Sequence, residues 1–199
     1  ASLGAFVTVC AERALDDALQ AERMLVNAPD AAAMKPLLGV PVSIKDMVPT
    51  KGIRTTMGSL TRADWVPDFD PPVVERIAES GAVLLGKTNT SEYGWKGESG
   101  NRVVGPTRNP WKRDRTAGGS SGGAAAALAS GLCTLASGSD GGGSIRIPAS
   151  FCGVFGIKPS QGRVPRFGGY GRPAANQFSQ SGPLSRTVAD ATMFLQVLA

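Results

Sequence analysis

Two glycine-serine segments flank an alanine-rich run in GGSSGGAAAALASGLCTLASGSDGGGSIRIPAS, which spans residues 118–150. The alanine-rich run predicts a helix of small residues from about Ser121 to Ser130, because alanine is the strongest helix former. Gly131 ends it, since glycine readily adopts the left-handed conformation. The following LCTLAS predicts a buried strand. Three interpretations of the glycine-serine segments are open at this point: a linker, a phosphate-binding loop or part of a catalytic site.

The rest of the chain continues the alternation of strands and helices. The alternating apolar residues Val40, Val42 and Ile44 predict a strand that ends on Lys45 and Asp46. The other expected elements are an amphipathic helix over 11–26 with Leu15, Ala18 and Leu19 on its apolar side, a loop over 28–36, a helix over 70–81 capped by Asp70 and ended by Gly81, a strand over 82–86, and a final helix that begins at Ser185. This order predicts an α/β sheet with parallel neighbouring strands.

Length and composition indicate one globular domain, since the chain has 199 residues of which 42% are hydrophobic. With no long apolar run and no signal-peptide pattern at the start, we expect a cytoplasmic protein without membrane contact. The chain ends inside an apolar helical pattern, so the domain over 1–199 is expected to be incomplete at its C-terminus.

Charge is unevenly distributed, with 10 basic and 13 acidic side chains in the first hundred residues and 11 basic and 3 acidic ones after them. The densest basic cluster consists of Arg102, Arg108, Lys112, Arg113 and Arg115. Because Trp111 is the sole aromatic residue interleaved with it, a solvated face is favoured over a nucleic-acid surface.

The chain contains no histidine. A Ser-His-Asp triad, a Cys-His pair and any histidine-ligated metal are therefore excluded within it, and we expect neither metal nor cofactor. Cys10, Cys133 and Cys152 lack metal-binding spacing and are expected to be buried free thiols.

The segment GAVLLGKT, residues 81–88, matches the phosphate-loop pattern GxxxxGK[ST]. A phosphate loop needs a strand before its first glycine and a helix at its Lys-Thr pair, whereas here a helix precedes Gly81 and the middle residues are apolar. We therefore interpret Lys87 as an ordinary lysine at a strand end.

Serine chemistry without histidine needs another base, and a buried lysine can be neutral near pH 7 because desolvation penalises its charged form. Lys45 is the candidate, although a plain ion pair with Asp46 is an equal alternative. The three glycines before Ser144 would let backbone N–H groups converge on an oxyanion. In the first segment, Ser121 could simply cap the alanine-rich helix.

The chain resembles the amidase signature family. The resemblance rests on GVPVSIKD, GAVLLGKTN, GPTRNPW, GGSSGG, GSDGGGSIRIPASFCGVFGIKPSQGRV and SGPLSRTVAD, which follow one another in that family's order from Phe6 onward. It implies an α/β fold with a mixed, largely parallel central sheet covered by helices on both faces. The chain would form the N-terminal core part of that fold.

The resemblance also assigns roles. It implies that Lys45 is the catalytic base, that Ser120 is a bridging serine preceded by a cis peptide bond, and that Ser144 is the nucleophile. The oxyanion donors would be the N–H groups of Gly141, Gly142, Gly143 and Ser144. Ser121, Asp140 and Arg146 would support this network, with a buried ion pair or a backbone cap as the alternative for Asp140 and Arg146. The segment 92–99 is expected at the mouth of the site.

Two departures from the family stand out. Gly141 replaces the threonine or isoleucine of many members, and family members continue well beyond the final helix. In the family, the part beyond that helix completes the sheet and supplies much of the acyl-binding pocket.

The function implied is hydrolysis of a carboxamide C–N bond through an acyl-enzyme, releasing ammonia or an amine. One alternative is a glutamine-hydrolysing amidase subunit of a tRNA-dependent amidotransferase, and another is a catalytically silent fragment. The partners expected are a small amide substrate and, only for the amidotransferase alternative, a nucleic acid; a homodimer is left open. The residues after GRV, GYGRPAANQFSQSGPL, favour a general amidase.

Overall fold

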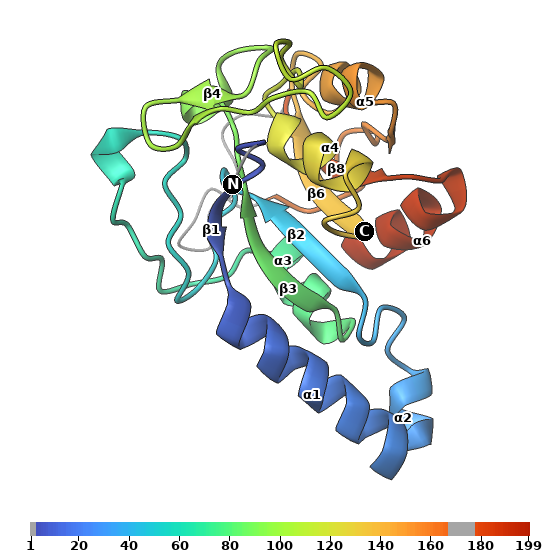
Figure 1. Ribbon diagram of the computed structural model, residues 1–199. Coiled ribbons are helices and arrows are strands. Elements are labelled where there is room, and N and C mark those ends of the chain that lie inside the picture. The colour runs from blue at the N-terminus through green and yellow to red at the C-terminus, as the bar shows by residue number, and fades with distance from the viewer. Residues whose placement is uncertain (1–2, 167–177) are drawn as a thin grey trace.

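The computed structural model describes residues 3–166 and 178–199, which are organised around one six-stranded sheet (Figure 1). The strand order is β1-β3-β2-β6-β8-β7. The strands are β1 (Phe6–Val9), β2 (Pro41–Lys45), β3 (Val83–Thr88), β6 (Leu135–Asp140), β7 (Phe155–Gly156) and β8 (Gln180–Ser185), and a separate small ribbon pairs β4 (Gly100–Asn101) with β5 (Gly105–Pro106).

The sheet is mixed, as the resemblance implied. The central strands β3, β2 and β6 are parallel, whereas β1 runs antiparallel to β3 and β8 runs antiparallel to β6. β7 pairs antiparallel with β8 and so shares the direction of the central strands. Four of the six strands thus point the same way, and their carboxyl ends lie at one edge of the sheet.

Helices cover both faces of the sheet. They are α1 (Ala11–Asn27), α2 (Pro29–Ala33), α3 (Pro72–Glu79), α4 (Gly122–Ala129), α5 (Arg146–Cys152) and α6 (Val188–Leu198), with single 3-10 turns at Leu60–Arg62 and Glu92–Gly94. In Figure 1, α4 lies in front of the strands and α3 behind them. The chain therefore has the α/β architecture expected from its sequence.

Two separate hydrophobic cores result from this layering. The core on the α4 face is built largely from alanines of α4 together with Ile145, Leu184 and Cys152. The core on the opposite face contains Val42 and Ile44 of β2, packed with residues of α3 and α6. Because successive residues of a strand point to opposite faces, Ser43 and Lys45 of β2 belong to the α4 face.

Some local expectations were wrong. The segment expected as a loop over 28–36 contains α2, which begins at Pro29, a residue suited to the first helical position. Asp70 does not cap α3, whose N-cap is Pro71; instead its carboxylate accepts a hydrogen bond from the N–H of Lys51. Ser185 ends β8, and the hydroxyl of Thr187 caps α6 by accepting from the N–H of Asp190.

The strands also differ from expectation in two ways. β6 begins at Leu135, three residues later than expected, because the chain first turns after Gly131. β1 and β8 were not expected at all. Both lie antiparallel to their central neighbours. β8, QSGPLS, contains Gly and Pro and so has a weak strand pattern, whereas β1, FVTV, consists of strand-favouring residues but is only four residues long.

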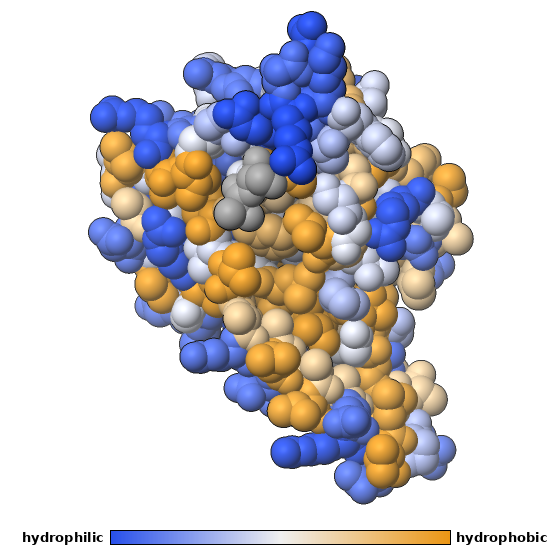
Figure 2. Space-filling model, in the orientation of Figure 1, coloured by the Kyte–Doolittle hydropathy of each residue, from blue (hydrophilic) through white to orange (hydrophobic). Residues whose placement is uncertain are grey.

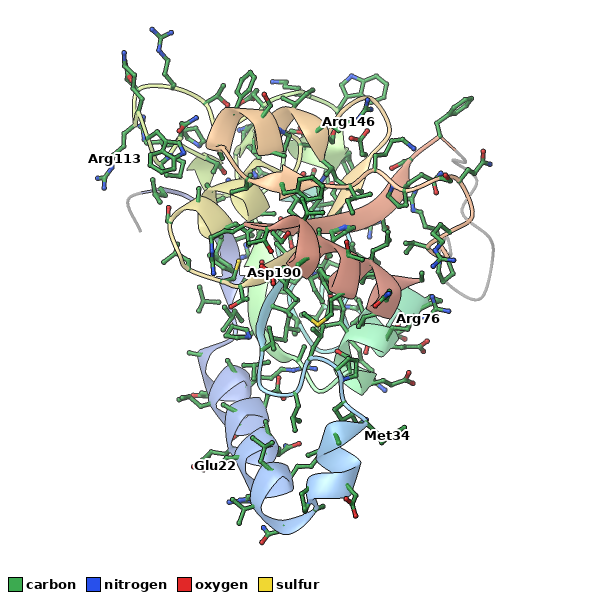
Figure 3. All side chains as sticks on the ribbon, turned by 90° about the vertical axis from the view of Figure 1, so that its right-hand side faces the viewer. Glu22, Met34, Arg76, Arg113, Arg146 and Asp190 are labelled. Atoms are coloured by element: carbon green, nitrogen blue, oxygen red, sulfur yellow. The ribbon has the colours of Figure 1, made fainter. Side chains whose placement is uncertain are left out.

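Apolar and basic side chains occupy different parts of the surface. Leu15 and Leu19 of α1 are exposed, and apolar residues extend over α1 in Figure 2. The basic cluster of the 101–117 loop is exposed, as a solvated face requires, and Arg113 points outward in Figure 3.

Cys133 and Cys152 are buried and Cys10 is half-buried, and all three are free thiols. Within residues 3–166 and 178–199, no helix combines the length and apolar character needed to span a membrane.

Candidate active site

Lys45 lies at the carboxyl end of β2 and is completely buried on the α4 face. Its Nζ donates hydrogen bonds to Ser120 Oγ at 2.7 Å and to Ser139 Oγ at 3.1 Å. The pKa of Lys45 is lowered to about 7, chiefly by burial; the charge of Asp140 opposes this shift and that of Arg166 adds to it. Lys45 does not pair with Asp46, whose carboxylate is held by the N–H and hydroxyl of Thr56. Lys45 is thus a lysine that can be neutral near physiological pH.

Ser120 lies at the start of α4, and the peptide bond from Gly119 to Ser120 is cis, as the resemblance implied. Its side chain is buried yet reaches the wall of a cleft. Ser120 Oγ thus contacts Lys45 while its residue forms part of the cleft wall.

Ser144 lies in the turn between β6 and α5 and lines the same cleft. Its carbonyl oxygen accepts a hydrogen bond from the N–H of Ser121 at 3.1 Å, which ties this turn to the start of α4. Ser144 Oγ has no hydrogen-bond partner within the described part of the chain. A hydroxyl in this state is available to a bound substrate, and catalytic hydrogen bonds often form only in the substrate complex.

The glycine loop before Ser144 differs in one respect from expectation. Gly141, Gly142 and Ser144 line the cleft, but Gly143 does not, and its N–H donates to Asp140 Oδ1 at 2.7 Å. That donor is therefore already used within the loop. The N–H groups of Gly141, Gly142 and Ser144 are the ones left to face a substrate.

Asp140 and Arg146 hold this loop in shape. Besides Gly143, the Asp140 carboxylate accepts from the N–H groups of Ile145 and Arg146 and from Arg146 Nε and Nη2, both at 2.9 Å. These bonds lower the pKa of Asp140 to about 2 despite its burial. Arg146 itself is exposed and lies in the upper part of the molecule in Figure 3. The two expected alternatives, an ion pair and a backbone cap, are thus both present and enclose the Ser144 turn.

Ser121 does not cap α4 with its side chain. Its hydroxyl exchanges hydrogen bonds of 3.4 Å with the N–H and carbonyl of Ser139, while its N–H bonds Ser144. Ser121 therefore links β6, α4 and the Ser144 turn. Sequence reasoning missed Ser139, because its contact with Lys45 depends on the parallel pairing of β2 with β6.

The cleft that Ser120, Ser139 and Ser144 share has a volume of about 520 Å³. Tyr93, Gly94, Trp95, Lys96 and Gly97 line it, so the expectation that the segment 92–99 approaches the mouth is confirmed for these residues. Other parts of the wall are Met47, Val48 and Pro49, which follow Lys45 closely in the chain, and Ile147, Arg166 and Phe178.

Lys87 is not the ordinary strand-end lysine that its sequence context suggested. It is fully buried in β3, and its Nζ donates to Val48 O, to Thr50 Oγ1 at 2.7 Å and to Thr55 Oγ1 at 2.9 Å. Burial lowers its pKa to about 7, while Asp46 opposes that effect. The phosphate-loop motif is nevertheless a coincidence, because residues 83–88 form a strand that follows α3. Lys87 fastens the loop after Lys45, and its hydrogen bonds go to none of the site serines.

Replacing Lys87 by methionine should reduce the free energy of unfolding by about 1–3 kcal/mol, because buried oxygens of Val48, Thr50 and Thr55 lose their donor. Urea unfolding measures this change. Lys51→Met, at an exposed position, serves as the control and should change it by less than about 0.5 kcal/mol. If Lys87→Met instead left stability unchanged and removed any activity, Lys87 rather than Lys45 would be the base to consider.

Comparisons with known proteins agree on a family. The family model described as Amidase matches residues 1–199. The A subunit of glutamyl-tRNA(Gln) amidotransferase from Desulforapulum autotrophicum is 47% identical over 199 residues, which are 100% of this chain and 39% of that protein. Its counterpart from Synechococcus sp. (strain WH7803) is 48% identical over 196 residues, covering 98% of this chain and 39% of the relative. The chain thus spans about two fifths of the length of the curated relatives it matches.

Solved structures give the same result. The native peptide amidase of Stenotrophomonas maltophilia superposes with a TM-score of 0.88 at 35% identity, over 99% of this chain and 40% of that one. The arrangement of sheet and helices described above is therefore shared with a solved amidase.

Proposed function

The chain belongs to the amidase family, and from that premise we propose that it hydrolyses a carboxamide through an acyl-enzyme formed on Ser144. The observation that carries the proposal is the 2.7 Å hydrogen bond between Lys45 Nζ and Ser120 Oγ, at the wall of a cleft that Ser144 also lines. Since the chain has no histidine, the Lys45–Ser120 pair would take the role that histidine has as the general base in a Ser-His-Asp triad. We further propose that residues 1–199 belong to one amidase-signature domain, because both cores pack against the same sheet.

Acylation starts with Lys45 neutral. Lys45 Nζ accepts the hydroxyl proton of Ser120 while Ser120 Oγ accepts the proton of Ser144, and Ser144 Oγ forms a bond to the amide carbon. The carbonyl oxygen becomes an oxyanion, stabilised by the N–H groups of Gly141, Gly142 and Ser144. The C–N bond then breaks, the leaving nitrogen takes a proton from Ser120, and Ser120 recovers one from Lys45.

Deacylation repeats these steps with water. A water molecule attacks the ester carbon while its proton passes through Ser120 to Lys45. The bond to Ser144 Oγ breaks and the proton returns to that oxygen, releasing a carboxylic acid. Asp140 and Arg146 keep the loop in place throughout, because their bonds to its backbone do not involve the reacting groups.

The names of the curated relatives favour the amidotransferase alternative. The relatives with 45–48% identity over nearly all of this chain are glutamyl-tRNA(Gln) amidotransferase A subunits. The prediction of a general amidase rests on the stretch GYGRPAANQFSQSGPL. Much of that stretch belongs to residues 167–177, which lie outside the described residues. We therefore propose glutamine hydrolysis with transfer of ammonia to a tRNA-linked acceptor as the specific activity. Hydrolysis of simple or peptide amides is the second candidate, supported by the likeness to the peptide amidase.

A fluorophosphonate probe tests the proposed chemistry, since it reacts covalently with an activated serine. We expect labelling of the protein and complete loss of labelling in Ser144→Ala, measured by intact mass. Ser137→Ala, which removes a buried hydroxyl that lacks a hydrogen-bond partner in the described structure, should label normally. Absence of labelling in the wild type would leave only the silent-fragment alternative.

Measuring ammonia release distinguishes the two candidate activities, glutamine hydrolysis and hydrolysis of simple or peptide amides. Glutamine-dependent release that rises when charged tRNA and the other components of an amidotransferase are added would support the first candidate. Turnover of peptide or simple amides, without any response to glutamine, would replace it by the second. In either case Ser144→Ala should release no ammonia.

A further inference from the structure

The segment before β4 packs directly against the start of α4. A Cβ added to Gly119 would lie 2.4 Å from the carbonyl carbon of Glu98, and one added to Gly122 would lie 2.7 Å from Ser99 Oγ. The two glycines that flank the serines of GGSSGG therefore leave room for residues 98 and 99. This contact brings Ser99 beside the backbone of Ser120.

The hydroxyl of Ser99 makes two hydrogen bonds there. It donates to the carbonyl oxygen of Ser120 at 3.0 Å and accepts from the N–H of Gly122 at 2.8 Å. The second bond satisfies the first N–H of α4, a group that the N-cap residue Ser121 leaves without a side-chain partner of its own. Ser99 thus caps α4 from a distant part of the chain and fixes the peptide group that follows Ser120.

Ser99 itself is held rigidly. It is completely buried, and its carbonyl oxygen accepts a hydrogen bond from the N–H of Thr107 at 2.6 Å. It is not among the residues that line the cleft, so it has no route to a substrate. Any effect of Ser99 on the reaction must therefore pass through Ser120.

We propose that Ser99 is a positioning residue for the reaction: its hydroxyl fixes the backbone between Ser120 and Gly122 and thereby holds Ser120 Oγ between Lys45 and Ser144. The inference rests on the proposed function. Ser120 is bonded to Lys45 through its side chain, but a proton relay also requires its oxygen to face the nucleophile. The Ser99 hydroxyl supplies that second constraint through the main chain.

Ser99→Ala tests the inference by the rate of acylation of Ser144, followed with a fluorophosphonate at several concentrations. The maximal rate per folded protein should fall by about 10–100-fold, since small displacements of a positioned group have effects of that size. The half-saturating probe concentration should change less than about twofold, because Ser99 does not touch the cleft. A general loss of packing would not separate these two quantities.

Three further variants sharpen the result. Ser99→Thr keeps the hydroxyl and should restore the maximal rate to within about threefold of the wild type. Ser137→Ala, the buried control, should match the wild type in both quantities. If Ser99→Ala does not accumulate as folded protein, Ser99→Cys replaces it, and its weaker hydrogen bonds should give an intermediate fall.

The outcomes distinguish this inference from the function on which it rests. A labelled wild type and an unchanged maximal rate in Ser99→Ala or Ser99→Cys would overturn the role of Ser99 alone. An equal fall in Ser99→Thr and Ser99→Ala would overturn it as well, because the hydroxyl would then be irrelevant. A wild type that is not labelled at Ser144 would reject both the function and the inference.

Discussion

Replacing Lys45 by alanine should abolish acylation of Ser144 at neutral pH, with a loss of about 10⁴-fold, the upper range for removing a general base. Lys45 Nζ is the basic group hydrogen-bonded to Ser120. The other hydrogen-bond partner of Lys45 is the hydroxyl of Ser139, which is not basic near pH 7. The rate of fluorophosphonate labelling measures the effect. Acylation at a rate comparable with the wild type would show that the proposed base is wrong.

The same lysine should set the pH dependence. Because burial lowers the pKa of Lys45 to about 7, its neutral form increases as the pH rises through 7. The wild-type acylation rate should therefore be low at pH 5, increase through pH 7 and level off above it. Lys87→Met is the matched control: Lys87 has a similarly lowered pKa but bonds none of the site serines, so the profile should persist in that variant. A profile that disappears in Lys87→Met would show that Lys87 rather than Lys45 sets it.

Gly123→Ala should be the most destabilising small substitution in α4. The added Cβ would lie 2.3 Å from the N–H nitrogen of Asn89 and 2.5 Å from the carbonyl oxygen of Ala5, and neither backbone atom can move aside easily. We expect the free energy of unfolding to fall by about 3 kcal/mol, at the upper end for overpacking a core. Urea unfolding checks this value.

Gly131→Ala at the other end of α4 is the matched control. A Cβ there meets nothing within 4 Å, but Gly131 has a φ of +68°. The expected cost is about 1–2 kcal/mol from the left-handed conformation alone. If Gly123→Ala cost no more than Gly131→Ala, the close approach of α4 to Asn89 and Ala5 would not be a constraint on the fold.

The central layer of the fold could be predicted from local patterns. Val42 and Ile44 alternate with Ser43 and Lys45, and that period alone puts Lys45 and Ser43 on the same face of their strand. The alanine content of α4 likewise indicates a helix that neighbouring backbones can approach closely. The cis bond before Ser120 could be expected only from the family resemblance, because local sequence does not encode it.

Other features could not be predicted, because they arise from contacts between distant segments. Ser121 has the right residue type for an N-cap, yet it is the hydroxyl of Ser99, from a separate segment, that accepts the hydrogen bond at that end of α4. Lys87 was interpreted from the strand that contains it, but the oxygens that bind it belong to the loop after β2. Gly143 has the backbone freedom of an oxyanion donor, and only the folded loop reveals that Asp140 has taken its N–H.

Within the described residues Ser144 Oγ has no hydrogen-bond partner, so under the proposed mechanism the moment of reaction depends on what enters the cleft. Lys45 and Ser120 are already joined by a hydrogen bond, whereas Ser144, the proposed nucleophile, would keep its proton until a bound substrate aligns its hydroxyl with Ser120 Oγ. Under the proposed mechanism, occupancy of the cleft and activation of the serine become a single event. The protein would then discriminate between amides by how well each one completes that alignment. Without a bound substrate, Ser144 would stay unreactive.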